Sequence, residues 1–386
     1  MTASDPTATG LDFEFNTVPA IVFRRGAAAD LGPLLAPRFD ARRALIVTDK
    51  GVRGAGLLEP GVASLRQAGF EVSIFDEVTA DPPEAVVHGA AAAAREGGDL
   101  VIGFGGGSAM DAAKLAATLA DGGQPLEEMY GVGLVTVGRR PLVQIPTTAG
   151  TGSEVTPIAI VTRGEDLKMG VVSPSLYADL AVLDPETTLG LPPAVTAATG
   201  VDAMVHAIES FTSRIKKNPV SDALALRGLR LLHGAVPRAC ADGANIAARE
   251  QALLGSMLAG QAFANAPVGA VHALAYPLGG LFHLPHGLSN ALVLPHVLRF
   301  NMPAAETLYA EIGAALGAPG GAEGFVAEME RLCEEVGVRQ RLRDHQISHN
   351  DLPRMAEDAM KQTRLLVNNP REVTYDDALR LYEEAL

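Results

Sequence analysis

The sequence predicts an α/β nucleotide-binding domain over residues 1–190 and an all-helical domain over residues 191–386. In the first half, short runs rich in Val, Ile and Leu alternate with helical stretches, which is typical of a parallel sheet covered on both faces. After LGLPP (189–193) the chain changes to long Ala- and Leu-rich stretches with helical periodicity and few β-branched runs. A chain of 386 residues is also too long for one ordinary core.

The individual elements follow from the same patterns. Buried strands are expected in the apolar runs at 41–49, 70–78, 99–106, 141–148 and 179–185. Helices are expected near 57–68 and at 82–98, where the second ends at a glycine pair. In the second half the clearest helices are 223–240 and 249–266. The Gly-rich segment 314–324 is expected to be a loop between two helices.

Composition excludes several classes of function. The net charge of −14 argues against a nucleic-acid or anionic-membrane partner, because phosphate binding needs a basic surface. No uninterrupted apolar run is long enough for a transmembrane helix, and residues 1–18 lack a secretory pattern and read as a tail before the first strand. Cys240 and Cys333 are too few and too distant for a disulfide framework or a cysteine-ligated metal, which favours a cytoplasmic location.

A glycine-rich turn joins the strand DLVIGFGG to the helix-like GGSAMDAAKLAA. Gly105, Gly106, Gly107 and Ser108 stand at this strand-to-helix turn. Glycines let a ligand approach the backbone, and a helix N-terminus offers unpaired N–H groups and a positive dipole end. The turn therefore favours a pyrophosphate site, although it matches neither GxGxxG nor the Walker pattern. The alternative is a tight turn without a ligand.

Two further features of the first half support nucleotide binding. Asp49 closes the strand at 41–49, at the edge of the sheet where ligands gather. Its carboxylate could hydrogen-bond an adenosine ribose and would repel a 2′-phosphate, so we expect NAD in preference to NADP. The alternative role for Asp49 is a helix N-cap. The loop PTTAGTGSEVTP (146–157) offers small and hydroxyl side chains that could wrap a ribose or nicotinamide, or could be an ordinary turn.

The second half contains a candidate metal site. Asp202 and His206 are four residues apart in the helix-like VDAMVHAIES, so they lie on one face, one turn apart. His272 and His286 follow in VHALAYPLGGLFHLPHG. One carboxylate and three imidazoles suit Fe²⁺ or Zn²⁺, and the absence of a nearby cysteine argues against a structural zinc. The alternative is that such histidines are satisfied core residues, which we apply to His233 and His296.

Between the last two histidines lie the helix breakers Pro277, Gly279 and Gly280. We expect them to end one helix and turn the chain, so that the two imidazoles converge from different elements.

Taken together, these residues resemble the iron-containing (group III) alcohol dehydrogenases, whose members include lactaldehyde reductases and 1,3-propanediol dehydrogenases. The resemblance extends over nearly the whole chain from about Ala20. It rests on the motifs GGGSAMDAAK (105–114), IPTTAGTGSEVTPIAI (145–160), ATGVDAMVHAIES (198–210), HALAYPLGGLFHLPHGLSNALVLPHVLRFN (272–301) and NPREVTYDD (369–377).

The resemblance implies a dehydroquinate-synthase-like architecture with the active site in the cleft between the two domains. It implies that the metal ligands are Asp202, His206, His272 and His286, and that the metal is usually iron and in some members zinc. It implies a homodimer or a larger homo-oligomer. Positions similar to the family's cofactor contacts are Asp49, Gly105, Gly106, Gly107, Ser108, Asp111, Thr147, Thr148, Thr151 and Lys168.

The chain departs from the family at one position. Many relatives carry a second histidine four residues after the third ligand, which is His272 here, and that histidine often has a catalytic or substrate-facing role. In this chain the position is Tyr276. Tyr276 or His283 is the candidate to pass the proton to solvent, and the alternative for His283 is a surface or ligand-supporting histidine.

The sequence therefore favours a metal-dependent oxidoreductase that moves a hydride between a small alcohol or aldehyde and NAD(H), with the metal polarising the substrate oxygen. One alternative is a metal- and NAD-dependent lyase of the dehydroquinate synthase kind. Another is a maleylacetate-reductase-like enzyme, although those relatives lack the PHG pattern kept at 285–287. A third is a non-enzymatic nucleotide sensor with a helical assembly module.

Overall fold

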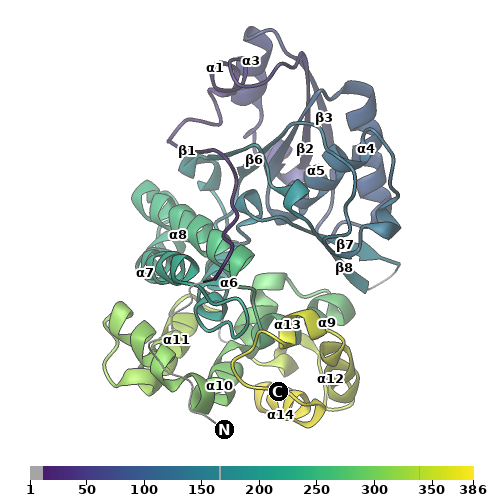
Figure 1. Ribbon diagram of the computed structural model, residues 1–386. Coiled ribbons are helices and arrows are strands. Elements are labelled where there is room, and N and C mark those ends of the chain that lie inside the picture. The colour runs from purple at the N-terminus through teal and green to yellow at the C-terminus, as the bar shows by residue number, and fades with distance from the viewer. Residues whose placement is uncertain (1–11, 165–166, 339) are drawn as a thin grey trace.

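The computed structural model describes residues 12–164, 167–338 and 340–386. An α/β part forms the upper half of the molecule in Figure 1, and a helical part forms the lower half. Most of the tail expected at 1–18 lies outside the described residues. Its described portion lies against α8 (Ile246–Asn265), where the Asn16 N–H donates to the Asn265 side chain at 2.7 Å.

The α/β part is built on a parallel sheet with the strand order β1-β9-β6-β4-β2-β3. The five predicted strands are confirmed. The strands of this sheet are β1 (Ile21–Phe23), β2 (Arg43–Asp49), β3 (Glu71–Val78), β4 (Leu100–Gly105), β6 (Leu142–Pro146) and β9 (Leu180–Leu183).

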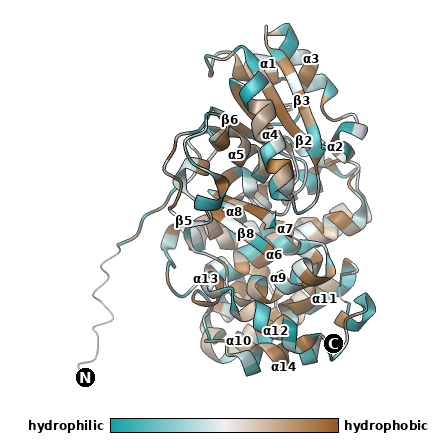
Figure 2. Ribbon diagram, turned by 90° about the vertical axis from the view of Figure 1, so that its right-hand side faces the viewer, coloured by the Kyte–Doolittle hydropathy of each residue, from teal (hydrophilic) through white to brown (hydrophobic). Residues whose placement is uncertain are grey.

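Helices cover both faces of the sheet, as predicted, because successive strand residues point to opposite sides. From β2, Ile46 packs with α1 (Leu31–Leu35) and α3 (Glu59–Gln67). Its neighbour Val47 packs on the other face with α4 (Glu84–Gly97) and α5 (Gly107–Leu119). Figure 2 shows hydrophobic residues along the strands between these layers.

The strand order creates a switch point between β2 and β4. From β2 the chain passes through α2 (Lys50–Gly54) and α3 to β3 on one side, and from β4 it passes through α5 toward β6 on the other. The loops after these two neighbouring strands therefore diverge and leave a crevice at the carboxyl edge of the sheet. Ligands of open α/β sheets bind at such a point.

A second, small sheet was not predicted. It has the order β5-β8-β7, with β5 (Gly131–Val132), β7 (Ile158–Arg163) and β8 (Leu167–Val172), and β7 pairs with β8 in antiparallel fashion. It brings Lys168 close to the helical part, because β8 contacts α9 (Ala270–Phe282).

The second half is helical, as predicted, and no strand follows β9 among the described residues. A loop between two helices is present where one was expected at 314–324, but it is shorter and covers only 317–320, since one helix ends at Leu316 and the next begins at Gly321. No described helix is long and apolar enough to span a bilayer. The remaining helices are α6 (Pro193–Phe211), α7 (Pro219–Ala241), α10 (His286–Leu316), α11 (Gly321–Glu335), α12 (Leu352–Met360), α13 (Thr363–Leu366) and α14 (Tyr375–Ala385).

Helix α8 joins the two halves. Its Leu253 and Met257 belong to the apolar cluster on one face of the sheet. Gly260 lies so close to Gly152, in the loop after β6, that a Cβ built on Gly152 would be 2.6 Å from the Gly260 Cα. Glycine is needed at position 152 for a second reason, because its φ is +60°. The loop after β6 is therefore fixed directly on the helical half.

The prediction that Pro277, Gly279 and Gly280 end a helix is wrong. Helix α9 continues through all three to Phe282, and the chain turns at His283, whose φ is 55°. Pro277 has no N–H to donate to the Ala273 carbonyl, so the helix continues with one bond of its ladder missing. The buried Tyr382 hydroxyl of α14 donates to the Leu274 carbonyl at 2.7 Å, one turn before the breakers.

Candidate metal and nucleotide site

One face of α6 carries the three ionisable side chains of this helix. Asp202, His206 and Glu209 are spaced by four and three residues, so they lie along one stripe. All three are at most 6% exposed. Buried charges persist only when they are paired or bind a metal, so we expect other side chains or a metal ion to contact these three residues.

The partners come from α9 and α10. His272 lies in the first turn of α9, and His286 is the first residue of α10. The donor atoms of Asp202, His206, His272 and His286 all lie within 4.8 Å of one another. Ligands at about 2.1 Å from one ion are about 3 to 4 Å apart, so the most separated of these atoms need to close by about 1 to 2 Å. The predicted metal cluster is therefore brought together by the fold, and its donors fit a divalent ion such as Fe²⁺ or Zn²⁺.

The rings of the cluster are held in place by packing. His206 stacks on Phe263 of α8 at a centroid distance of 4.2 Å and on His272 at 4.7 Å. The His272 and His286 Nε2 atoms face Asp202 Oδ1 at 3.8 and 3.5 Å.

Electrostatics keep the donors in the states that a metal requires. Burial lowers the pKa of His206 to about 3, although the negative charge of Asp202 acts to raise it. Partial burial also lowers the pKa of His286, and here too the negative charge of Asp202 acts to raise it. Burial works to raise the pKa of Asp202, but the three imidazoles and a hydrogen bond from Asn290 hold it below its ordinary value. The lowered pKa values favour neutral imidazoles at His206 and His286 and an ionised carboxylate at Asp202, the forms that bind metals.

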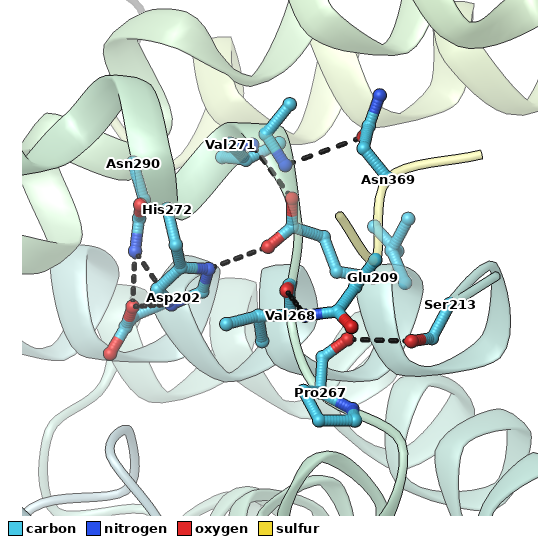
Figure 3. A network of polar contacts seen from close by, with 12 residues as sticks. Asp202, Glu209, Ser213, Pro267, Val268, Val271, His272, Asn290 and Asn369 are labelled. Atoms are coloured by element: carbon cyan, nitrogen blue, oxygen red, sulfur yellow. Dashed lines mark hydrogen bonds and ion pairs between the residues drawn. The ribbon is translucent and has the colours of Figure 1, made fainter. Parts of the chain in front are cut away.

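Glu209 supports the cluster from behind, as Figure 3 shows. Its Oε2 lies 2.6 Å from His272 Nδ1, and its Oε1 accepts from the Val271 N–H at 2.7 Å. A carboxylate on the far ring nitrogen fixes the tautomer that leaves the other nitrogen free for a metal. Sequence reasoning missed Glu209, although its spacing of seven residues from Asp202 is two helical turns on the same face.

Asn290 is the second residue that sequence reasoning missed. Its Nδ2 donates to Asp202 Oδ1 at 2.6 Å and lies 3.3 and 3.4 Å from the Nε2 atoms of His272 and His286. It follows His286 by four residues on α10, so helical spacing could have identified it as well.

The start of α9 is closed by side chains from distant segments. Its own N-cap, Gly269, offers no side chain, and Asn369 Oδ1 accepts from the Ala270 N–H at 3.3 Å while Glu209 takes the next N–H. Asn369 is itself buried and exchanges hydrogen bonds with Asn301 of α10 at 2.7 and 2.9 Å. The motif beginning at residue 369 therefore holds the helix that carries His272.

A second site lies at the switch point of the sheet. A cleft of about 800 Å³ is lined by Asp49, by the end of β3 and by Gly106, Gly107 and Ser108 at the start of α5. Asp49 Oδ1 caps α2 by accepting from the Val52 N–H at 2.9 Å, so the alternative role considered for this residue is present. Its position in the cleft wall leaves the second carboxylate oxygen for a ligand.

The threonines of the loop after β6 flank this cleft. A Cβ on Gly107 would lie 2.8 Å from the Thr151 side chain, and one on Gly106 would lie 3.7 Å from Thr148 Oγ1. Thr147 is buried, and its N–H donates to the Gly105 carbonyl at 3.0 Å. The loop and the glycine turn therefore form one continuous wall.

Asp111 is occupied by protein partners. Its two oxygens accept from the Ser153 hydroxyl at 2.6 Å and from the Ile160 N–H at 2.9 Å. Lys114 is fully buried nearby and donates to Ser153 Oγ at 2.7 Å. Burial raises the pKa of the neighbouring Glu154 to about 7. These contacts hold the loop after β6 against α5.

Lys168 connects the two sites. Its Nζ pairs with Asp81 Oδ1 at 2.6 Å and donates to Thr162 at 3.1 Å. Asp81 directly follows Ala80, which lines the nucleotide cleft, and β8, which carries Lys168, contacts α9, which carries His272. The nucleotide cleft and the metal cluster therefore adjoin.

The two candidate proton-transfer residues differ in position. Tyr276 lies on α9, one turn after His272, and its ring is 6.3 Å from the His286 ring in an edge-on contact. Burial raises its pKa, while the nearby Arg364 opposes the rise by charge and hydrogen bonding. His283 is exposed in the turn between α9 and α10, and no described hydrogen bond or ring contact joins it to the metal cluster.

Two family models match the chain. "Iron-containing alcohol dehydrogenase" matches residues 19–185, and "Fe-containing alcohol dehydrogenase family, C-terminal" matches residues 196–386.

Individual relatives are similar over nearly the full length. Long-chain-alcohol dehydrogenase 1 of Geobacillus thermodenitrificans is 41% identical over 362 residues, which cover 90% of each chain. A crystal structure of 1,3-propanediol oxidoreductase has a TM-score of 0.92 at 37% identity and covers 97% of this chain and 100% of its own. A crystal structure of sulfoacetaldehyde reductase from Bifidobacterium kashiwanohense in complex with NAD⁺ has a TM-score of 0.88 at 28% identity, with 97% and 99% covered.

Proposed function

Because this chain belongs to the iron-containing alcohol dehydrogenase family, we propose that it oxidises a small alcohol, or reduces the matching aldehyde, with NAD(H) in the cleft between its two halves. The observation that carries the proposal is that four convergent metal donors adjoin a nucleotide cleft through Lys168 and Asp81. We divide the chain near residue 190, since β9 ends at Leu183 and α6 begins at Pro193.

Asp202, His206, His272 and His286 are the proposed ligands, with Fe²⁺ as the expected ion and Zn²⁺ as the alternative. When bound, the ion supplies Lewis-acid polarisation of the substrate oxygen. The protein's own part is positioning. Glu209 fixes the His272 tautomer, and Asn290 orients Asp202.

The glycine turn at the start of α5 is the proposed pyrophosphate site, with Thr148 and Thr151 beside it. Asp49 lies across the cleft where an adenosine ribose would sit, and its charge disfavours a 2′-phosphate. NAD is therefore the proposed cofactor in preference to NADP, and the NAD⁺ complex of the related sulfoacetaldehyde reductase supports NAD.

Tyr276 is the proposed group for handling the substrate proton, because its ring touches that of His286. His283 is the second choice, since it is exposed and farther along the turn. A homodimer or larger assembly is a further expectation from the family, and sedimentation velocity measures it directly.

The test begins with anaerobic purification, elemental analysis and a panel of short alcohols with NAD and NADP. His272→Ala should lose bound metal and NAD reduction together. His233→Ala is the matched control, because His233 pairs with Glu328 outside the cluster and should keep both. Full turnover by metal-free His272→Ala would refute the proposal. Dehydroquinate-synthase-like chemistry, the alternative, predicts bound NAD without net NADH from any alcohol.

A further inference from the structure

Three consecutive residues of the loop after β6 contact three different parts of the molecule. Gly150 lies against α6, where a built Cβ would be 2.7 Å from the Thr199 Cβ, one turn before the first proposed metal ligand of that helix. Thr151 lies against Gly107 in the glycine turn, and Gly152 lies against α8. This three-residue segment, which we call the junction, therefore touches the proposed pyrophosphate site and the helix of two proposed metal ligands at once.

A fully buried lysine holds the chain that follows the junction. Lys114 of α5 has three N–H donors on its ammonium group, and three acceptors face them. Its Nζ donates to Ser153 Oγ at 2.7 Å and to the Ile158 carbonyl at 2.6 Å. The third acceptor is Thr156 Oγ1, at 3.4 Å. The whole donor capacity of this ammonium is therefore used on one short stretch, residues 153–158.

Ser153 is the centre of these contacts. Its hydroxyl accepts from Lys114 and donates to Asp111 Oδ1 at 2.6 Å, and its N–H donates to Thr151 Oγ1 at 3.2 Å. Asp111 precedes Lys114 by three residues on α5, and its carboxylate lies 3.5 Å from the ammonium. Its second oxygen accepts from the Ile160 N–H at 2.9 Å. The network of Lys114, Asp111 and Ser153 thus holds the junction residue that faces the glycine turn.

Stability alone does not explain a buried ammonium at this position. Removing a charged group from water is costly, and apolar residues of similar volume often serve stability equally well. Hydrogen bonds fix both a distance and an angle, whereas apolar contacts are non-directional. The network therefore specifies where the loop lies relative to α5, in a way that apolar packing of the same segment would not.

We propose that Lys114, Asp111 and Ser153 are positioning residues for hydride transfer, which set the separation between the cofactor and the metal cluster through the junction. The proposal rests on the proposed dehydrogenase function and adds residues that act through Gly150 and Thr151. Hydride transfer depends strongly on such a setting, because misplacing reacting groups by about 1 Å can lower a rate by about 100-fold.

Ser153→Ala is the principal test, since it removes one hydroxyl and leaves both charged groups in place. We expect the dissociation constant of the holoenzyme for NAD, measured by isothermal titration calorimetry, to rise about tenfold, the worth of about one hydrogen bond. The kcat at saturating NAD should also fall about tenfold, because the bound nicotinamide is no longer aligned with the metal. Metal affinity should stay at the wild-type value, because all four donors come from α6, α9 and α10.

Thr118→Val is the matched control on the same helix. It also removes a buried hydroxyl, but that hydroxyl donates to the Lys114 carbonyl within α5, at 2.9 Å. NAD affinity and kcat should therefore stay at wild-type values. Equal losses in Thr118→Val and Ser153→Ala would assign the effect to the stability of α5 and overturn the proposal.

A second variant displaces the junction and leaves the network intact. Gly150→Ala places a Cβ 2.7 Å from the Thr199 Cβ, which is too close, so the loop or α6 has to shift. We expect the same two losses, in NAD affinity and in kcat. Losses in Gly150→Ala without losses in Ser153→Ala would show that the junction matters and the network does not, which would also overturn the proposal.

These measurements separate the positioning role from the proposed function. If wild type reduces NAD with an alcohol and Ser153→Ala binds NAD and turns over equally well, the positioning role fails and the dehydrogenase function stands. If no alcohol reduces NAD, the function fails. In that case a weaker NAD affinity of Ser153→Ala, with unchanged metal affinity, would still support the network as the device that places the cofactor, and an unchanged NAD affinity would refute it.

Discussion

Replacing Glu209 by Gln should weaken metal binding by about 10- to 100-fold without unfolding the protein. Glu209 serves two donors at once, the His272 Nδ1–H at 2.6 Å and the Val271 N–H at 2.7 Å. A glutamine can keep the bond to Val271 only by turning its NH₂ toward His272. The ring then has to accept at Nδ1 and carry its proton on Nε2, the nitrogen that faces Asp202.

The alternative is for the glutamine to turn around and keep the His272 tautomer. The buried Val271 N–H would then face an NH₂ group and lose its acceptor, which costs about 1 to 3 kcal/mol. Metal binding needs this second orientation, because only it leaves His272 Nε2 without a proton. The cost of about 1 to 3 kcal/mol therefore lowers metal affinity by about 10- to 100-fold, since about 1.4 kcal/mol corresponds to tenfold.

The assay is competition against a fluorescent chelator for Fe²⁺ and for Zn²⁺, with elemental analysis of the purified proteins. Glu328→Gln is the matched control, because Glu328 makes the same 2.6 Å contact to a histidine, His233, outside the cluster. It should retain wild-type affinity. Metal affinity in Glu209→Gln equal to that of wild type would refute the positioning role of Glu209.

Two further predictions concern the nucleotide half. Asp49→Asn keeps an oxygen for the Val52 N–H but removes the charge, so kcat/KM with NADPH relative to NADH should rise roughly tenfold, a change of about 1.4 kcal/mol; an unchanged ratio would exclude Asp49 from ribose recognition. The pKa of buried Glu154, raised to about 7 from 4.5, implies stability that is fully present below pH 4.5 and is lost as pH rises through 7. Glu154→Gln should therefore gain about 3 kcal/mol relative to wild type between pH 4.5 and pH 8, measured by urea unfolding, and a pH-independent difference would contradict this.

Local patterns were sufficient for much of this fold. The strand from Arg43 to Asp49 and the helix over 223–240 lie where periodicity indicated them, because each buries a face that its own sequence defines. Part of the metal cluster could be predicted from the sequence for a related reason, since Asp202 and His206 share one face of a helix. Glu209 and Asn290 obey the same spacing rule and could have been found by extending it by one or two turns.

Other features depend on contacts that no local pattern contains. Helix α9 runs through Pro277, and Tyr382, far along the chain, donates a hydrogen bond to the Leu274 carbonyl of this helix. Arg364 of α13 lies close to Gly170 of β8, which likewise requires α13 to fold back against the small sheet. Asp111 illustrates the reverse case, since a motif suggested a cofactor contact and the structure gives its carboxylate two protein donors.

The closure of α9 by Asn369 also sets an order of events during synthesis. The four metal donors have all left the ribosome once residue 286 has emerged, but the helix that carries His272 still lacks an acceptor for its first N–H. That acceptor arrives only when Asn369 docks between α9 and Asn301. The support of the helix that carries His272 is therefore incomplete until this last segment has docked.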